Sequence, residues 1–134
     1  MSEEIEIARQ WLDKADNDLL NADNNLSSSR IPYDTVCFHC QQAVEKMLKA
    51  FLVANRIAYP ISHDLLLILE SILIVEPQAE KLRDFLVLLN PYAVEIRYPD
   101  EYNMPSDKDA AEARNAAGKI RNWLKNTCPI IFSE

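Results

Sequence analysis

A single glycine among 134 residues is the feature that most constrains what this chain can fold into. Two-residue hairpin turns, Walker loops and the phosphate loops of dinucleotide-binding folds all need glycines, because their backbones require positive φ or a close approach of the main chain. The chain cannot build these features in their usual form. The sequence therefore argues against a β-sandwich, a P-loop NTPase and a dinucleotide-binding fold.

Apolar residues recur at steps of three and four in five segments, over residues 5–26, 33–54, 65–73, 79–89 and 110–124. This spacing places the apolar side chains of each segment on one face of a helix. The seven prolines lie outside these segments and separate them. The pattern predicts an all-α, up-and-down bundle of about five helices, with the widely apolar second helix at its centre. A chain of this length suits a single domain, residues 1–134.

Local signals at the segment ends predict where the helices begin. Ser2 is expected to cap the first helix, because a serine side chain accepts a hydrogen bond from a free backbone N–H group. Pro77 suits the first turn of the fourth helix. Ser106 with Asp109 resembles a capping box at the start of the last helix, with Asp in place of the longer Glu.

The net charge of −7 argues against a protein that coats duplex DNA, because such binding depends on Lys and Arg at the phosphates. Residues 107–125 nevertheless hold five bases and three acids, so a local basic face remains open. The chain shows no secretory leader and no apolar run long enough to span a membrane. We therefore expect a cytoplasmic protein with reduced cysteines and no membrane association.

The motif Cys-Phe-His-Cys at residues 37–40 has three interpretations: a zinc site, a redox pair or part of the core. A redox pair needs its first thiol at a helix N-terminus, whereas both cysteines are expected one to two turns into the second helix. A closed zinc site needs four ligands, and only His63 and Cys128 remain elsewhere to complete it. The two motif cysteines also fall on the apolar arc of the second helix, where small residues fit a core. The interpretation as small core residues is favoured, and the sequence predicts no metal site and no cofactor.

The polar strip of the second helix consists of His39, Gln42, Glu45, Lys46 and Lys49. One interpretation is an ordinary solvated helix surface, since a Glu and a Lys four residues apart form a favourable surface pair. The other interpretation is a basic groove that contains the imidazole of His39 and holds a phosphate or a nucleotide. The sequence leaves both interpretations open.

The tripeptide Ser62-His63-Asp64 precedes the third helix. Its neighbouring side chains diverge, and the chain lacks a G-x-S-x-G context, so a catalytic triad is not expected. We expect Ser62 to cap the helix and His63 to make a polar interaction.

Residues 92–102 gather three tyrosines, one arginine and three acids at a helix end. Arg97 could clamp a phosphate or carboxylate with its planar guanidinium, and the tyrosines could stack on a base. Alternatively, the aromatic rings plug the end of the bundle while Arg97 pairs with an acid of another helix.

Residues 38–50, which read FHCQQAVEKMLKA, resemble the second-helix signature of HEPN domains (higher eukaryotes and prokaryotes nucleotide-binding). The stretch Ser62-His63-Asp64-Leu65, the segment from Tyr92 to Pro99 and an Ala-rich segment at 110–124 follow in the order that this family shows. The resemblance spans about residues 5–125, the expected core of the domain.

The resemblance implies a helical bundle that forms a homodimer, similar to the C-terminal domain of kanamycin nucleotidyltransferase. Such proteins are often paired with a minimal nucleotidyltransferase, in some branches as a toxin–antitoxin system whose HEPN member is a metal-independent RNase. The RNase branches carry an Arg-x4–6-His motif, whereas here Arg97 is followed five residues later by Tyr102. Without the imidazole, the usual general acid–base group is missing, which favours a protein without catalytic activity of its own.

The leading hypothesis is a non-nucleolytic, dimeric partner or substrate-binding subunit of a nucleotidyltransferase. Arg97 and Tyr98 would bind phosphate or base, Lys46 and Lys49 would supply positive charge, and His39 would orient the ligand.

Two alternatives remain from the sequence. One is an atypical, metal-independent RNase toxin that uses Arg97 and Tyr102 as its catalytic pair and takes RNA as substrate. The other is a structural dimer that recruits proteins through its acidic first helix.

Overall fold

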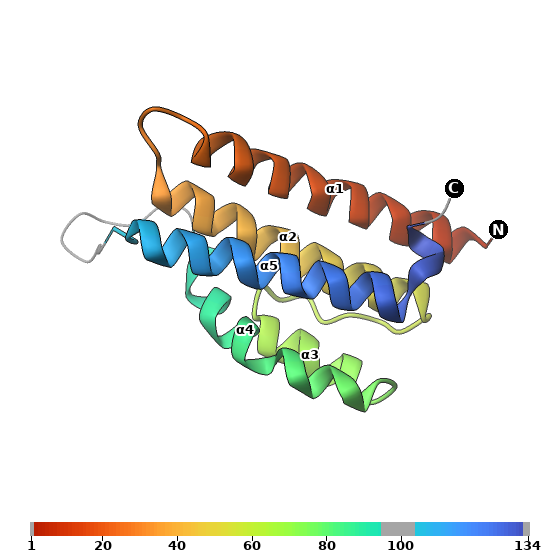
Figure 1. Ribbon diagram of the computed structural model, residues 1–134. Coiled ribbons are helices and arrows are strands. Elements are labelled where there is room, and N and C mark those ends of the chain that lie inside the picture. The colour runs from red at the N-terminus through yellow and green to blue at the C-terminus, as the bar shows by residue number, and fades with distance from the viewer. Residues whose placement is uncertain (1, 95–103, 133–134) are drawn as a thin grey trace.

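The computed structural model describes residues 2–94 and 104–132 (Figure 1). The described part contains five α-helices and no strand, which confirms the predicted all-α bundle. The helices are α1 (Glu3–Leu26), α2 (Tyr33–Ala54), α3 (Leu65–Leu73), α4 (Arg83–Leu89) and α5 (Asp107–Thr127). Three short 3-10 turns, η1 (Pro77–Leu82), η2 (Asn90–Ala93) and η3 (Pro129–Ile131), lie between or after them. Within the described ranges, no helix is both long and apolar enough to cross a membrane.

Helix α2 is the centre of the bundle, as its wide apolar arc predicts. It packs against α1 along most of its length, against α5 on another side, and against α3, α4 and η2. Figure 1 shows α1, α2 and α5 as long neighbouring rods, with the shorter α3 and α4 together on the side away from α1. The core therefore lies around α2, and every residue of α2 is buried or partly buried.

The predicted caps at Ser2 and Ser106 are confirmed. The Ser2 hydroxyl accepts a hydrogen bond from the Ile5 N–H at 3.2 Å. Ser106 and Asp109 form a full capping box, in which each side chain accepts from the other's backbone N–H at 3.0 and 2.9 Å. These two caps satisfy N–H groups that the first turn of a helix leaves free.

The predicted start of the third helix is wrong by two residues. Asp64, not Ser62, is the N-cap of α3, and its carboxylate accepts from the Leu66 N–H at 3.0 Å. Ser62 instead accepts from the Asp64 N–H at 3.0 Å. Asp and Ser are equally good N-caps, so the local sequence alone does not choose between them. The fourth helix also differs, because Pro77 starts a 3-10 turn that continues into α4 at Arg83.

The cysteines of the 37–40 motif are core residues. Cys37 and Cys40 are completely buried, as the favoured reading predicts. Burial raises the pKa of Cys37 to about 11 and that of Cys40 to about 12. Among the described residues, no group of three or more His, Cys, Asp or Glu side chains is arranged to hold a metal ion.

The only glycine of the chain, Gly118, lies in the middle of α5 and not in a turn. A glycine there costs about 1 kcal/mol relative to alanine, because it loses more backbone freedom on folding. Its φ is not positive. A Cβ at this position would have one described neighbour within 4 Å, Arg114 Nη1 at 3.5 Å, which is an ordinary contact. Neither the backbone nor the packing of the described chain requires glycine there.

Candidate functional site

The predicted ligand-binding residues divide into two groups. Arg97 and Tyr98, together with Tyr102 of the alternative catalytic pair, lie outside the described residues. His39, Lys46 and Lys49 lie on α2, in the part that the structure describes. The contacts of this second group show how the charges of α2 are arranged.

His39 and Lys46 both contact Asp18 of α1. His39 Nδ1 lies 2.9 Å from one carboxylate oxygen of Asp18, and Lys46 Nζ donates to the other. The Asp18 side chain is only 10% exposed, so this cluster of polar side chains is held between the two helices. The positive charge of Lys46 is therefore compensated within the chain rather than offered to a ligand.

Lys49 forms a buried ion pair with Glu45. Lys49 Nζ donates to Glu45 Oε2 at 2.9 Å, and the two side chains are 11% and 6% exposed. The same carboxylate reaches the following loop, where its Oε1 lies 2.8 Å from Nδ1 of His63. The pair therefore lies inside the bundle and not on a solvated helix surface.

Two aromatic rings enclose the Lys49 ammonium. Its Nζ lies 5.6 Å from the centre of the Trp11 ring and 5.3 Å from that of Tyr59, within the range of a cation–π interaction. The two rings meet edge to face, with centroids 6.0 Å apart. Lys49 is thereby fixed between α1, α2 and the loop after α2.

The two glutamines of the second-helix signature have a structural role. Gln41 is completely buried, and its Nε2 donates to the His63 carbonyl at 3.2 Å. Gln42 Nε2 donates to Gln41 Oε1 at 2.7 Å. Gln41, Glu45 and Lys49 are spaced by four residues and so share one face of α2. This face holds the loop between α2 and α3 against the bundle.

Asp18, the partner of both His39 and Lys46, is not among the site residues predicted from the sequence. Its position carries a usable signal, because it lies three residues after Ala15 and four before Ala22 on the inward stripe of α1. A charged residue on such a stripe needs a buried partner.

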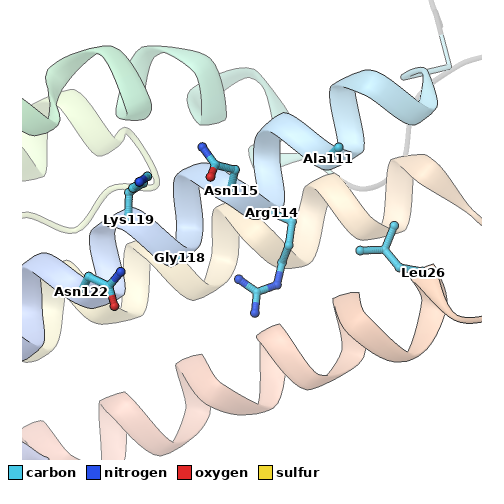
Figure 2. Close-up of a pocket in the computed structure, with 7 residues that line it drawn as sticks. All are labelled: Leu26, Ala111, Arg114, Asn115, Gly118, Lys119 and Asn122. Atoms are coloured by element: carbon cyan, nitrogen blue, oxygen red, sulfur yellow. The ribbon is translucent and has the colours of Figure 1, made fainter.

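A second candidate site is a pocket of about 570 Å³ along the exposed side of α5 (Figure 2). It is lined by Leu26, Ala111, Arg114, Asn115, Gly118, Lys119 and Asn122. Figure 2 shows Arg114 extending from α5 toward α1, whereas Asn115 and Lys119 extend from the opposite flank of the helix. The pocket belongs to the segment whose local excess of bases the sequence indicated.

Arg114 is oriented by Asp23 of α1. Its Nε and Nη2 donate to the two carboxylate oxygens of Asp23 at 2.7 and 3.2 Å, and this pairing raises the pKa of Arg114 above its usual value. Two turns along, Arg121 pairs with Asp16 in the same way, at 2.8 and 3.0 Å. The Nη1 group of Arg114 makes neither bond to Asp23 and lies beside Gly118.

The other polar groups of the pocket are available to a ligand. Within the described part of the chain, no carboxylate lies within 4.0 Å of Lys119 Nζ, and the side-chain amides of Asn115 and Asn122 have no hydrogen-bond partner. All three side chains are exposed. The pocket thus combines an ammonium that has no ion-pair partner among the described residues, two amides that can donate and accept, and a fixed guanidinium.

The architecture is that of a helical-bundle domain whose second helix carries an internal charged network. The family model of the HEPN domain matches residues 8–127, and the chain therefore belongs to the HEPN domain family. This confirms the family resemblance read from the second helix.

One solved structure supports the same fold. The crystal structure of TT1696 from Thermus thermophilus is similar to this chain with a TM-score of 0.72 and 28% sequence identity. The similarity covers 89% of this chain and 96% of that one. Comparison with curated proteins gives no match.

Proposed function

We propose that this HEPN-domain protein is a non-nucleolytic nucleotide- or substrate-binding partner of a minimal nucleotidyltransferase, in a pair of the toxin–antitoxin kind. It acts as a cytoplasmic homodimer and binds the nucleotide in the α5 pocket. Catalysis belongs to the nucleotidyltransferase, which brings the carboxylates that bind its metal ions.

The polar composition of the α5 pocket is the observation that carries this proposal. Lys119 supplies a positive charge for phosphate, and the Nη1 group of Arg114, which makes neither bond to Asp23, can donate to an acceptor of the ligand. The amides of Asn115 and Asn122 can pair with the donors and acceptors at the edge of a base. A volume of about 570 Å³ is in the range of small-ligand sites.

The proposal relocates the ligand from α2 to α5. On α2, the charges of Lys46 and Lys49 are compensated within the chain by Asp18 and Glu45, so the proposal assigns the phosphate to Lys119. Arg97 and Tyr98 stay in the proposal as residues that bind the phosphate or the base, a role that rests on the family resemblance. Tyr102, in the place where RNase members have His, motivates the non-nucleolytic assignment.

The partner is tested by a pull-down from the native host, using the tagged full chain. The expected result is a stoichiometric small nucleotidyltransferase. Recovery of RNA without such a protein, together with RNA cleavage by the purified chain in the presence of chelator, would replace the proposal with the RNase alternative. Recovery of neither would favour the structural dimer.

The ligand is tested by titrating ribonucleoside triphosphates into the protein, alone and with the recovered partner, in a calorimeter. Lys119→Ala is expected to weaken binding about tenfold, which corresponds to the loss of one charge-assisted contact. Lys125→Ala is the matched control, because Lys125 is an exposed lysine of the same helix outside the pocket. Equal affinities of Lys119→Ala and the native protein would remove the α5 pocket from the proposal.

A further inference from the structure

Gly118 is the one residue of the α5 pocket that the described chain does not explain. Alanine would fit its position and would suit the helix better, yet the single glycine of the sequence stands there. Gly118 is also partly exposed and lines the pocket, between the flank that carries Arg114 and the flank that carries Lys119 (Figure 2). A missing Cβ at such a place lets an outside group come closer to the helix backbone.

The kind of group that can use this space follows from the helix itself. Gly118 lies eleven residues after the start of α5 and nine before its end, so its N–H and C=O are engaged in the helix hydrogen bonds. An anion at Gly118 would find no free donor from the backbone. The bare Cα and its neighbouring peptide planes can instead accept van der Waals contact from a flat, weakly polar face.

We infer that Gly118 is the platform on which the base of a bound nucleotide lies flat, an inference that rests on the proposed function and assigns the parts of its ligand. The base edge faces the amides of Asn115 and Asn122, two turns apart on the same flank as Lys119. The phosphates lie toward Lys119. The Nη1 group of Arg114, beside Gly118, meets the opposite edge of the base or the sugar.

The orientation of Arg114 supports this arrangement. Its bidentate pair with Asp23 holds the guanidinium at the side of the pocket, so that it forms a fixed wall beside the glycine. A side chain at position 118 would contact Nη1 and would stand between this wall and the amides. The glycine therefore keeps open a slot whose polar groups lie at its edges and whose floor is apolar.

The test compares native protein, Gly118→Ala and Lys119→Ala in calorimetric titrations with ATP, GTP, CTP, UTP and inorganic tripolyphosphate. Gly118→Ala is expected to weaken the tightest nucleoside triphosphate about tenfold and to leave tripolyphosphate unchanged, because only the base loses its platform. Lys119→Ala is expected to weaken both kinds of ligand. Lys125→Ala is the control that changes neither.

The thermal midpoint of Gly118→Ala provides a second readout. The removal of a mid-helix glycine is expected to raise it by about 4 °C, so that this variant is more stable and binds less well. A drop in the midpoint would show that packing within the chain requires the glycine, and would overturn the inference. A change of oligomeric state in light scattering, with nucleotide affinity unaltered, would assign the slot to a contact between two copies and would also overturn it.

The outcomes separate this inference from the proposed function. If Gly118→Ala binds every nucleotide as the native protein does while Lys119→Ala weakens them, the inference fails and the proposed function stands. If the native protein binds none of the nucleotides, alone or with its partner, both fail.

Discussion

The carboxylate of Glu45 lies 2.8 Å from the imidazole Nδ1 of His63, which is 18 residues later in the chain. The same carboxylate pairs with Lys49, and the carbonyl of His63 accepts from Gln41. Two residues of one α2 face, Gln41 and Glu45, therefore hold His63 of the loop before α3. This loop also supplies Tyr59, which covers the Lys49 ammonium.

Glu45→Gln is expected to destabilise the protein by about 3 kcal/mol. The substitution keeps the shape of the side chain but leaves the buried ammonium of Lys49 without a compensating charge. Urea unfolding followed by circular dichroism measures the loss.

Glu112→Gln is the matched control for this substitution. Glu112 is exposed and its oxygen lies 3.9 Å from Lys108 Nζ, so its loss is expected to cost under about 0.5 kcal/mol. A double variant, Glu45→Gln with Lys49→Met, should recover part of the stability, because it removes the uncompensated charge. An equal effect of the Glu45 and Glu112 substitutions would contradict the network.

Asp18→Asn is expected to lower the free energy of unfolding by about 2 kcal/mol. Two basic side chains, His39 and Lys46, share the Asp18 carboxylate in a mostly buried place between α1 and α2. Asp13→Asn changes an exposed acid of the same helix and should cost far less. Chemical unfolding at pH 7 measures the free energy of unfolding of the two variants. Similar losses in both would contradict a special contribution of Asp18 to stability.

Much of the fold could be predicted because its signals are local. The step of three and four along each segment identifies the helices, and the Ser106–Asp109 capping box lies within one turn of chain. The error at Ser62 is of the same local kind, since Asp64 is an equally suitable cap.

The candidate site could not be predicted to the same extent because its contacts are distant in sequence. Glu45 and Lys49 have the spacing of a surface pair, and their burial depends on His63 and Tyr59 folding back over them. The α5 pocket likewise depends on Asp23, 91 residues earlier, which orients Arg114. The composition of residues 107–125 indicated a basic segment, but the sequence did not indicate which of its side chains are paired.

The cap of α3 is expected to weaken in acid. The hydrogen bond from the Asn90 side chain to Asp64 (2.9 Å), and then the backbone N–H groups of the first turn, hold the pKa of Asp64 below its usual value of 3.8. The folded pKa is lower than the unfolded one, so the stabilising contribution is present above about pH 4 and is lost as the pH falls through the folded pKa.

Thermal unfolding between pH 5 and pH 2.5 measures this contribution against Asp64→Asn. Asparagine also caps helices but does not titrate, so the difference between the two proteins should shrink as the pH falls. A difference that stays constant over this range would contradict the assignment of Asp64 as the acid-sensitive cap.

Cys37 and Cys40 are expected to resist thiol reagents in the folded protein. Burial raises their pKa values to about 11 and 12. It outweighs the hydrogen bond of Tyr92, which lowers the pKa of Cys37, and the charge of Arg114, which lowers that of Cys40. At pH 8, the thiolate fraction of a group with a pKa of 11 is on the order of 0.1%, and the thiolate is the reactive form. Dithionitrobenzoate should therefore label these two cysteines only slowly at pH 8, and all three cysteines of the chain promptly in denaturant.

The variant Cys128→Ser separates the α2 cysteines from the third one. Burial also raises the pKa of Cys128, and its replacement leaves only the two α2 cysteines to be labelled. Prompt labelling of this variant without denaturant would show that the α2 cysteines are accessible, contrary to the core position that the structure gives them.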